Sequence, residues 1–381
     1  MGTPNLPILF NLPHLTGAEE GYLHTVLESR QLAGNGPFTR FCQDWLVQRY
    51  GFGKVLLTTS CTDALEMCAL LTEVGPGDEV ILPAFTFVST ANAFALRGAK
   101  LVFCDSRADE PNMDVEQVAQ LITPQTRVIV TVHYAGVAVD MDPILDLAQK
   151  HNLWIIEDAA QALNSHYKGK PLGSLGHLAA FSFHETKNLT SGEGGAFVSN
   201  YRSFDERADV IWEKGTNRMA FFRGQVDKYT WVDLGSSFLP SELNAAILRA
   251  QLEALDDIQS RRLNIWYRYL EGLKPLESAG KLRLPFIPSY TEPSANLFYL
   301  LTQTLEERNQ LTAWLKAKQV NAFFHYQRLH SSPFFHTLHD GRPLPHTERY
   351  ADTLLRLPLH YALTDADVDY VINQVIGFYS Q

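Results

Sequence analysis

Short apolar segments alternate with helical segments between residues 54 and 158, and this alternation constrains the fold more than any other feature. The apolar segments read as strands that are hydrophobic on both faces, which is typical of a parallel sheet covered by helices on both sides. The predicted strands are 54–58, 79–83, 100–104, 126–132 and 153–158, and the helices between them are 59–71, 89–96, 115–121 and 142–151. The sequence therefore predicts an α/β fold with a mostly parallel central sheet.

The alternation stops near residue 241, where a different organisation begins. One long helix is predicted from Ser241 to Gly272 because its apolar residues recur at helical spacing. Beyond it the chain reads as an α+β layer, with strands 295–301 and 320–324 and helices 306–318 and 364–379. We therefore expect a large domain with an N-terminal arm, residues 1–245, and a smaller C-terminal domain, residues 246–381.

Charge and cysteine usage argue against several classes of protein. With 32 Lys and Arg against 42 Asp and Glu, the net charge is −10, which disfavours nucleic acid and anionic membranes as partners. No leader and no membrane-spanning run is evident, so a cytoplasmic location is predicted. The four cysteines form no CxxC pair and the thirteen histidines show no metal-ligand spacing, so we expect free thiols and no metal site.

The segment from Phe181 to Gly195 contains a single lysine, Lys187, between an aromatic run and a cluster of glycines. Glycines allow tight turns and the close approach of a bound group. A lysine held in such a place is desolvated, which lowers its pKa and makes its amine nucleophilic. From this segment alone, an ordinary surface lysine before a hairpin is an equal alternative.

Other polar residues follow the strands that end at the same edge of the predicted sheet. Asp158 ends one strand, and Lys187 follows one crossover later. Ser60, Cys61 and Thr62 open a helix at this edge, and the N-terminus of a helix binds phosphate. Taken singly, Asp158 could be a helix cap or an ion-pair partner, and the hydroxyl residues could be plain N-caps.

Phe87 follows the next strand and offers a flat face, although alone it could equally be a core residue. A lysine, an acid, a phosphate cradle and an aromatic plate together fit pyridoxal 5'-phosphate. Lys187 would form a Schiff base with the aldehyde, Asp158 would keep the ring nitrogen protonated, and the helix end would hold the phosphate. The order of these features along one sheet is what favours the cofactor over the separate structural explanations.

Four segments, 75–80, 86–92, 157–161 and 181–195, together resemble the DegT/DnrJ/StrS sugar-nucleotide aminotransferases. The resemblance covers nearly the whole chain. It implies the type I aminotransferase fold, pyridoxal phosphate as cofactor, and a homodimer with its sites at the subunit interface. It also implies that Lys187 is the Schiff-base lysine and that Asp158 is the partner of the pyridine nitrogen, so these two are the predicted catalytic residues.

The same resemblance assigns further binding residues. Those implied for the cofactor are Ser60, Cys61, Thr62, Phe87, Asp158, Gln161, Ser182, Lys187 and Ser237. Those implied for the sugar nucleotide are His325, Tyr326 and His330, with a structural polar role as the alternative. Two positions depart from the family pattern: Cys61 replaces a glycine, where a backbone amide still serves, and Ser237 replaces an asparagine that reaches the partner subunit's phosphate.

Within the family, residues 213–218 and 221–231 resemble the transaminases that make TDP-4-amino-4,6-dideoxygalactose for enterobacterial common antigen. This implies L-glutamate as amino donor, a TDP-linked 4-keto-6-deoxyhexose as acceptor, and 2-oxoglutarate as the second product. Two alternatives share the fold. One is a sugar-nucleotide dehydratase or lyase, but such relatives carry histidine where this chain has Lys187. The other is a non-catalytic regulator, which the intact Lys187 and Asp158 disfavour.

Overall fold

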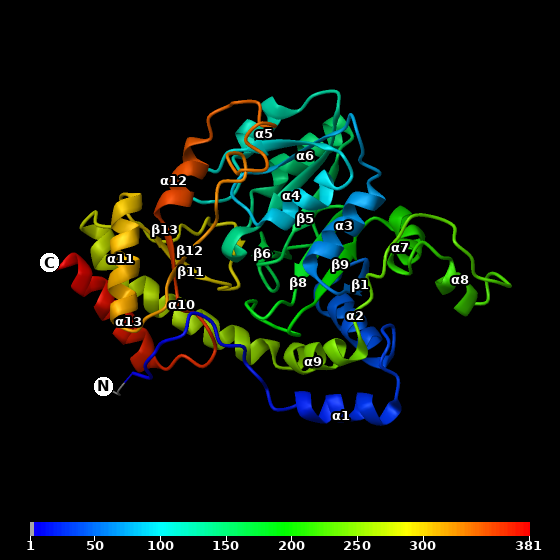
Figure 1. Cartoon of the computed structure of the whole chain (residues 1–381), viewed down its shortest axis with the longest axis horizontal. Helices are drawn as coiled ribbons and strands as arrows, with labels where there is room; N and C mark the ends of the chain where they lie inside the picture. Colours follow the sequence, from blue (N-terminus) through cyan, green and yellow to red (C-terminus); the bar gives the residue numbers. More distant parts are fainter. Residues whose placement is uncertain (1–3) are drawn as a thin grey trace.

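The computed structural model describes residues 4–381, and a seven-stranded sheet lies at its centre (Figure 1). In spatial order the strands are β1 (Lys54–Thr58), β9 (Gly195–Ser199), β8 (Leu178–Ser182), β5 (Trp154–Asp158), β4 (Thr126–Val132), β2 (Glu79–Pro83) and β3 (Lys100–Cys104). In this sheet only β9 runs antiparallel to its neighbours. The predicted mostly parallel sheet is confirmed. Met1 to Thr3, on which the expectation of no leader partly rests, lie outside the described residues.

Helices cover both faces of this sheet because successive strand residues point in opposite directions. In β1, Val55 and Leu57 face one apolar core, whereas Leu56 faces the other. The first core is covered by α2 (Pro37–Tyr50), α5 (Val115–Leu121), α6 (Met141–His151) and α9 (Glu242–Glu253). The second is covered by α3 (Cys61–Leu71), α4 (Val88–Ala95) and α7 (Asp205–Trp212). Helix α1 (Glu19–Ser29) packs against α9 (Figure 1).

A smaller antiparallel sheet in the C-terminal part has the order β11 (Phe298–Leu301), β13 (Leu354–Leu357) and β12 (Phe323–Phe324). The elements beside it are α10 (Leu255–Ser278), α11 (Leu305–Ala317), α12 (Pro345–Thr353) and α13 (Asp365–Tyr379). Strands β11 and β12 are shorter than the predicted strands 295–301 and 320–324. Ala295 has a left-handed backbone, with φ of 50°, and Val320 pairs instead with Ile8 of the N-terminal arm.

Short elements complete the chain. A third sheet pairs β10 (Thr291–Glu292), β6 (His166–Tyr167) and β7 (Lys170–Pro171), and α8 (Arg218–Phe222) lies in a loop that extends away from the large sheet (Figure 1). Within residues 4–381, no helix combines the length and the apolar character needed to cross a membrane. The same range contains no cluster of three or more His, Cys, Asp or Glu suited to a metal ion, and all four cysteines are free.

The prediction of one long helix from Ser241 to Gly272 is wrong. Helix α9 ends at Glu253 and α10 begins at Leu255, with Ala254 between them at φ −98° and ψ 6°. The break lets each helix follow its own core, because α9 packs under the large sheet and the later part of α10 packs under the small one. The proposed domain boundary at residue 245 falls inside α9 and stays a prediction.

Candidate active site

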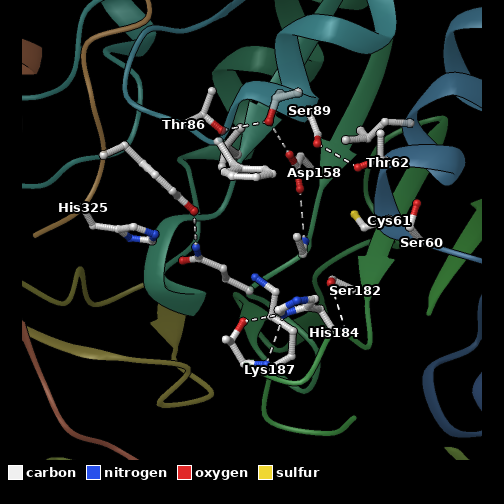
Figure 2. Close-up of a pocket in the computed structure, with 18 of the residues that line it drawn as sticks. Ser60, Cys61, Thr62, Thr86, Ser89, Asp158, Ser182, His184, Lys187 and His325 are labelled. Carbon is white, nitrogen blue, oxygen red and sulfur yellow. Dashed lines mark hydrogen bonds between the residues drawn. The ribbon is translucent and has the colours of Figure 1, made fainter. Parts of the chain in front are cut away.

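A cavity of about 600 Å³ opens at the carboxyl ends of β1, β2, β5 and β8, where the predicted residues were expected to meet (Figure 2). The predicted residues that line it are Ser60, Cys61, Thr62, Phe87, Asp158, Gln161, Ser182, Lys187, His325 and Tyr326. Residues that lie far apart in the sequence are thus brought together around one space. Ser237 and His330 do not line the cavity.

Lys187 lies in the loop between β8 and β9, and the loop is held by its own backbone. The amide of Lys187 donates to the carbonyl of His184 over 2.9 Å, and the amide of Phe183 donates to the carbonyl of Gly194 over 2.8 Å. Phe183 and Leu189 anchor the loop in the core. Burial lowers the pKa of the Lys187 amine, although the nearby Asp158 opposes the shift. The amine is therefore closer to its neutral, nucleophilic form than a surface lysine.

Asp158 ends β5 with its carboxylate held from two sides. Its Oδ2 accepts from the Thr90 hydroxyl over 2.6 Å, and its Oδ1 accepts from the amide of Ala160 over 3.2 Å. The Thr90 hydroxyl is itself 2.8 Å from that of Thr86. Burial raises the pKa of Asp158, because only 5% of the residue is exposed. A cation placed against this carboxylate would offset that cost.

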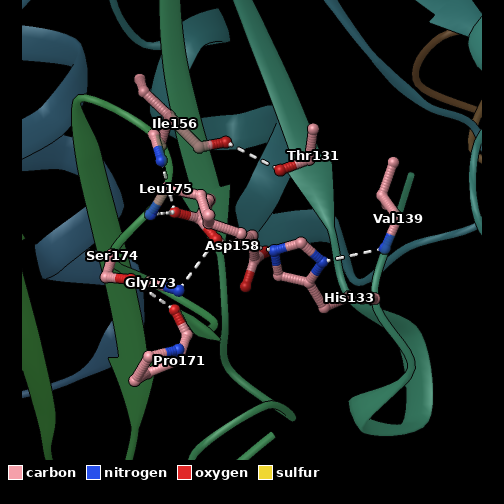
Figure 3. Close-up of polar contacts among 12 residues, drawn as sticks. Thr131, His133, Val139, Ile156, Asp158, Pro171, Gly173, Ser174 and Leu175 are labelled. Atoms are coloured by element: carbon pink, nitrogen blue, oxygen red, sulfur yellow. Dashed lines mark hydrogen bonds and ion pairs between the residues drawn. The ribbon is translucent and has the colours of Figure 1, made fainter. Parts of the chain in front are cut away.

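A second buried acid, Glu157, fixes the backbone next to Asp158, and its partners His133, Gly173 and Leu175 are labelled in Figure 3. Its carboxylate accepts from the amides of Gly173 and Leu175 over 2.8 Å each, and from Gly176 over 2.6 Å. His133 Nε2 lies 3.0 Å from the carboxylate, while its Nδ1 accepts from the amide of Val139. Since Nδ1 accepts, Nε2 carries the proton and donates to Glu157. The end of β5 is therefore tied to β4 and to the loop before β8.

The N-terminus of α3 forms an open anion site. Ser60 is the N-cap and accepts from the amide of Asp63 over 3.1 Å, so the amides of Cys61 and Thr62 have no partner within the helix. Gly195 of β9 passes so close that a Cβ there would lie 2.4–2.5 Å from backbone atoms of Ser60 and Cys61. A glycine is required at this crossing, and the two free amides with Ser182 nearby suit a phosphate group.

An aromatic wall and one fixed amide complete the cavity. Phe87 lines the cavity and is 56% exposed. One face of its ring is therefore open to stack on a bound ring. Gln161 is oriented at both ends: its Oε1 accepts from the amide of Ala135 over 2.7 Å, and its Nε2 donates to the Tyr326 hydroxyl over 2.9 Å. His325 Nδ1 is 3.0 Å from the Tyr134 hydroxyl, and burial holds the pKa of His325 well below its usual value.

Two predicted residues lie elsewhere in the chain. Ser237 is exposed and pairs with Glu213 in an isolated bridge. His330 is 5% exposed, with its Nε2 3.5 Å from a carboxylate oxygen of Glu348 and its ring 5.3 Å from that of His339. The role of Ser237 toward a partner subunit and that of His330 toward the substrate remain predictions.

Thr90 and Arg356 are among the cavity residues that the sequence reasoning did not name as site residues. Thr90 follows Thr86 by one helical turn, and this spacing of hydroxyls opposite a strand-end aspartate could have indicated it. Arg356 is a single charge inside the apolar run Leu354 to Leu357, which was the available signal.

Comparison with known proteins adds the following similarities. A family model described as the DegT/DnrJ/EryC1/StrS aminotransferase family matches residues 13–376. GDP-perosamine synthase of Escherichia coli O157:H7 is 30% identical over 372 residues, covering 97% of this chain and 97% of its own.

Two solved structures are similar over nearly the whole chain. The aminotransferase TlmJ from Streptoalloteichus hindustanus is 31% identical with a TM-score of 0.90, covering 98% of this chain and 99% of its own. The PLP form of Spr1654 from Streptococcus pneumoniae is 27% identical with a TM-score of 0.90, covering 98% of each chain.

Proposed function

This chain belongs to the DegT/DnrJ/EryC1/StrS aminotransferase family, and on that premise we propose that it transfers the amino group of L-glutamate to a TDP-linked 4-keto-6-deoxyhexose. It is a sugar-nucleotide aminotransferase that depends on pyridoxal phosphate, and its fold is the type I aminotransferase fold. The proposed products are TDP-4-amino-4,6-dideoxygalactose and 2-oxoglutarate. The amino sugar would serve cell-surface polysaccharides such as enterobacterial common antigen.

The observation that carries the reaction type is the meeting of Lys187, Asp158 and the open α3 terminus in one cavity. These residues fit the cofactor: the free amides of Cys61 and Thr62 would hold the phosphate, and Asp158 would face the ring nitrogen. When bound, pyridoxal phosphate carries the amino group between the two substrates and absorbs the charge of the reacting carbon.

The protein's own groups supply positioning and proton transfer. Nζ of Lys187, whose pKa is lowered by burial, takes a proton from the reacting substrate carbon and later returns it as a general acid. Gln161 is locked between Ala135 and Tyr326, so its amide cannot rotate away from the site. The exposed face of Phe87 sets the plane in which a flat ring can lie.

The acceptor sugar is assigned from the sequence and from the cavity wall. Residues 213–218 and 221–231 resemble the enzymes that aminate TDP-4-keto-6-deoxyhexoses. We propose that His325 and Tyr326 contact the hexose, because both line the cavity and His325 is held neutral by burial. A neutral imidazole can both donate and accept hydrogen bonds, as sugar hydroxyls require.

We also propose a homodimer whose neighbour covers the segment 218–234. Phe222 and Trp231 of this segment are 63% and 76% exposed, and the loop extends away from the large sheet (Figure 1). Large apolar side chains exposed together mark an interaction surface. Ser237 lies at the edge of the same segment, where it would reach the neighbour's site.

A GDP-linked keto sugar is the second candidate acceptor. It is favoured by the 30% identity to GDP-perosamine synthase over 97% of the chain. Both candidates require the same residues around Lys187, and the base of the nucleotide distinguishes them. The base is therefore the point that an experiment has to decide.

The deciding experiment is amino transfer from ¹⁵N-labelled L-glutamate to TDP-, GDP- and UDP-linked 4-keto-6-deoxyhexoses, followed by mass spectrometry and NMR of the sugar. A kcat/KM for the TDP sugar at least tenfold above the others, with ¹⁵N at carbon 4, supports the proposal. Preference for the GDP sugar overturns the base assignment, and loss of a hydroxyl without ¹⁵N uptake indicates a lyase. Lys187→Ala is the inactive control, and Lys170→Ala, at an exposed strand, is the matched active one.

A further inference from the structure

Tyr134 is a buried phenol that reaches the active site through a hydrogen bond to His325. It begins the short 3₁₀ helix Tyr134–Gly136 after β4, is 2% exposed and does not line the cavity. Its hydroxyl oxygen lies 3.0 Å from Nδ1 of His325, and within residues 4–381 this is the one hydrogen bond found for that hydroxyl. Tyr134 can therefore act on a cavity residue without touching a ligand itself.

The position of Tyr134 is fixed by its ring and by its backbone. The ring centre lies 5.3 Å from that of Phe85 and 5.9 Å from that of Tyr299, inside an apolar cluster. The amide of Tyr134 donates to Oδ1 of Asn112 over 2.9 Å. Because the phenol is held on all these sides, it holds the imidazole of His325 in place rather than following it.

The direction of this hydrogen bond follows from the surroundings of the two rings. Burial raises the pKa of Tyr134 well above its usual value, so the phenol keeps its proton. Burial, with Arg356 and Lys187 nearby, holds the pKa of His325 well below its usual value, so the imidazole is neutral and carries one proton. If His325 donated from Nδ1, the buried phenol hydrogen would be left without an acceptor, which is costly. Tyr134 therefore donates to Nδ1, and the imidazole proton lies on Nε2.

Nε2 of His325 is consequently a hydrogen-bond donor that faces the cavity. His325 lines the cavity, and Figure 2 shows its ring directed into it. Among residues 4–381 no hydrogen bond uses Nε2, and this nitrogen is not one of the buried atoms that lack a partner, so it stays accessible. His325 also lines a small lobe of the same site together with Lys187. The donor thus lies on the side of the cavity where the reaction takes place.

The same short helix also orients Tyr326, the neighbour of His325. The amide of Ala135 donates to Oε1 of Gln161 over 2.7 Å, and Nε2 of Gln161 donates to the Tyr326 hydroxyl over 2.9 Å. Because that hydroxyl oxygen accepts from Gln161, its own hydrogen remains for a ligand. Two neutral donors on neighbouring residues suit the oxygen atoms of a sugar, and they do not suit the ammonium group of an amino acid.

We propose that Tyr134 is a positioning residue that holds His325 as an Nε2–H donor, and that this donor binds the oxygen on carbon 3 of the acceptor hexose. The inference rests on the proposed acceptor, a 4-keto-6-deoxyhexose, and names the group that contacts it. Lys187 acts at carbon 4, where the keto oxygen is lost as the amino group arrives, and carbon 6 carries no hydroxyl. The hydroxyl on carbon 3 is therefore the nearest one that substrate and product both retain.

The test compares Tyr134→Phe with Tyr350→Phe in the cofactor-loaded enzyme. Both changes remove one hydroxyl from the same apolar cluster, but the hydroxyl of Tyr350 is buried without a hydrogen-bond partner and Tyr350 does not line the cavity. Stopped-flow absorbance measures the half-reaction with L-glutamate without sugar, and separately the half-reaction of the aminated enzyme with the keto sugar nucleotide that the wild type uses best. ¹⁵N NMR of labelled histidine shows which ring nitrogen of His325 carries the proton, with its signals identified by their loss in His325→Phe.

We expect His325 of the wild type to be neutral with its proton on Nε2, and Tyr134→Phe to show a mixture of the two tautomers. Tyr134→Phe should lower kcat/KM of the sugar half-reaction by about fivefold to fiftyfold and leave the glutamate half-reaction within about twofold of the wild type. Tyr350→Phe should match the wild type in both. In a His325→Phe background the further change Tyr134→Phe should have no effect, because the phenol acts through the imidazole.

A keto sugar nucleotide that lacks the hydroxyl on carbon 3 tests the oxygen assigned to His325. The wild type and Tyr134→Phe should react equally well with this 3-deoxy analogue, because the acceptor of the hydrogen bond is missing. An undiminished effect of Tyr134→Phe on the analogue would overturn the assignment of carbon 3.

Two results would overturn the role of Tyr134: a wild-type imidazole protonated at Nδ1, or a Tyr134→Phe variant that slows both half-reactions equally. The first is measured on the wild type, so it decides the matter even if Tyr134→Phe does not fold. The sugar half-reaction separates this failure from that of the proposed function. If the wild type aminates no 4-keto sugar nucleotide, the proposed function is wrong. If it does so and Tyr134→Phe does so equally well, only the role of Tyr134 is wrong.

Discussion

Replacing Asp158 with asparagine tests the proposed site most directly, because the change removes one charge and leaves the geometry. Asparagine has the same shape, and its Oδ1 can still accept from the amide of Ala160. Its amide would donate to the Thr90 hydroxyl, which can turn its hydrogen toward Thr86, 2.8 Å away. Since burial raises the pKa of Asp158, removing the charge should not destabilise the cofactor-free protein.

The expected loss of activity follows from the burial of this carboxylate. Two unit charges about 4 Å apart interact by about 4 kcal/mol at an effective dielectric constant of about 20. Asp158 is 5% exposed, so solvent does not reduce the interaction to its value in water. If this energy is lost where the ring nitrogen must stay protonated, the rate falls about a thousandfold.

The assay is the single-turnover half-reaction of the cofactor-loaded variant with L-glutamate, with thermal unfolding of the cofactor-free protein measured in parallel. Asp105→Asn is the matched control, because Asp105 is 3% exposed, accepts from the amides of His346 and Thr347, and does not line the cavity. A rate for Asp158→Asn within tenfold of the wild type, with cofactor bound, would refute the assignment of Asp158.

Three further changes give separate outcomes. Borohydride reduction of the cofactor-loaded wild type should fix the cofactor to Lys187, as peptide mapping can show. Lys187→Ala should lose both the covalent bond and turnover. A label on another lysine would contradict the mechanism. Gly195→Ala should cost about 1–3 kcal/mol of stability and weaken cofactor binding at least tenfold, because its Cβ would meet the backbone of Ser60. Gly21→Ala, in helix α1 with open space around it, should lower neither quantity, since alanine favours a helix more than glycine does. Burial raises the pKa of Glu110 from 4.5 to about 8 in the folded protein, so the wild type should lose stability as the pH rises from about 4.5 to 8. Glu110→Gln should flatten this dependence in thermal unfolding, and an equal slope in both proteins would show the shift to be wrong.

The strands of the large sheet could be predicted from the local sequence because they are buried on both faces. Strands β2, β3 and β4 are apolar through most of their length, with polar residues mainly at their starts, and their predicted bounds agree with the structure. In such a run the hydrophobic pattern leaves no choice of face, so only the ends need to be found. Turn residues such as Gly77, with φ of 96°, supply those ends.

The break at Ala254 could not be predicted in the same way. The apolar spacing continues across it, and neither proline nor glycine stands there. Leu252, Leu255 and Ile258 pack under the large sheet, whereas Ile265 and Trp266 pack in the C-terminal core. The chain bends because two cores lie in different places, and that is a tertiary effect without a local signal.

The residues of the site likewise divide into those that the sequence could group and those that it could not. Lys187, Asp158 and the α3 terminus follow strands of one parallel sheet, whose topology brings strand ends together, so spacing and residue type were enough to group them. His330 was grouped with His325 by the family resemblance, yet it packs against Glu348 outside the cavity. Arg356 reaches the cavity from the C-terminal sheet, and no rule of strand order relates the two sheets.

The charges of the cavity explain why a cation such as Arg356, contributed by the C-terminal sheet, matters for ligand binding. With a net charge of −10, the protein as a whole repels a dicarboxylate and a sugar nucleotide. At physiological salt, charges further apart than about 8 Å are largely screened, so binding depends on the groups that touch the ligand. In the cavity these are Lys187, Arg356 and the free amides of α3, set against the carboxylates of Asp158 and Glu193. The two cations balance these two carboxylates, so the cavity does not share the excess of negative charge of the whole protein, and anion binding there should survive added salt better than a surface ion pair would.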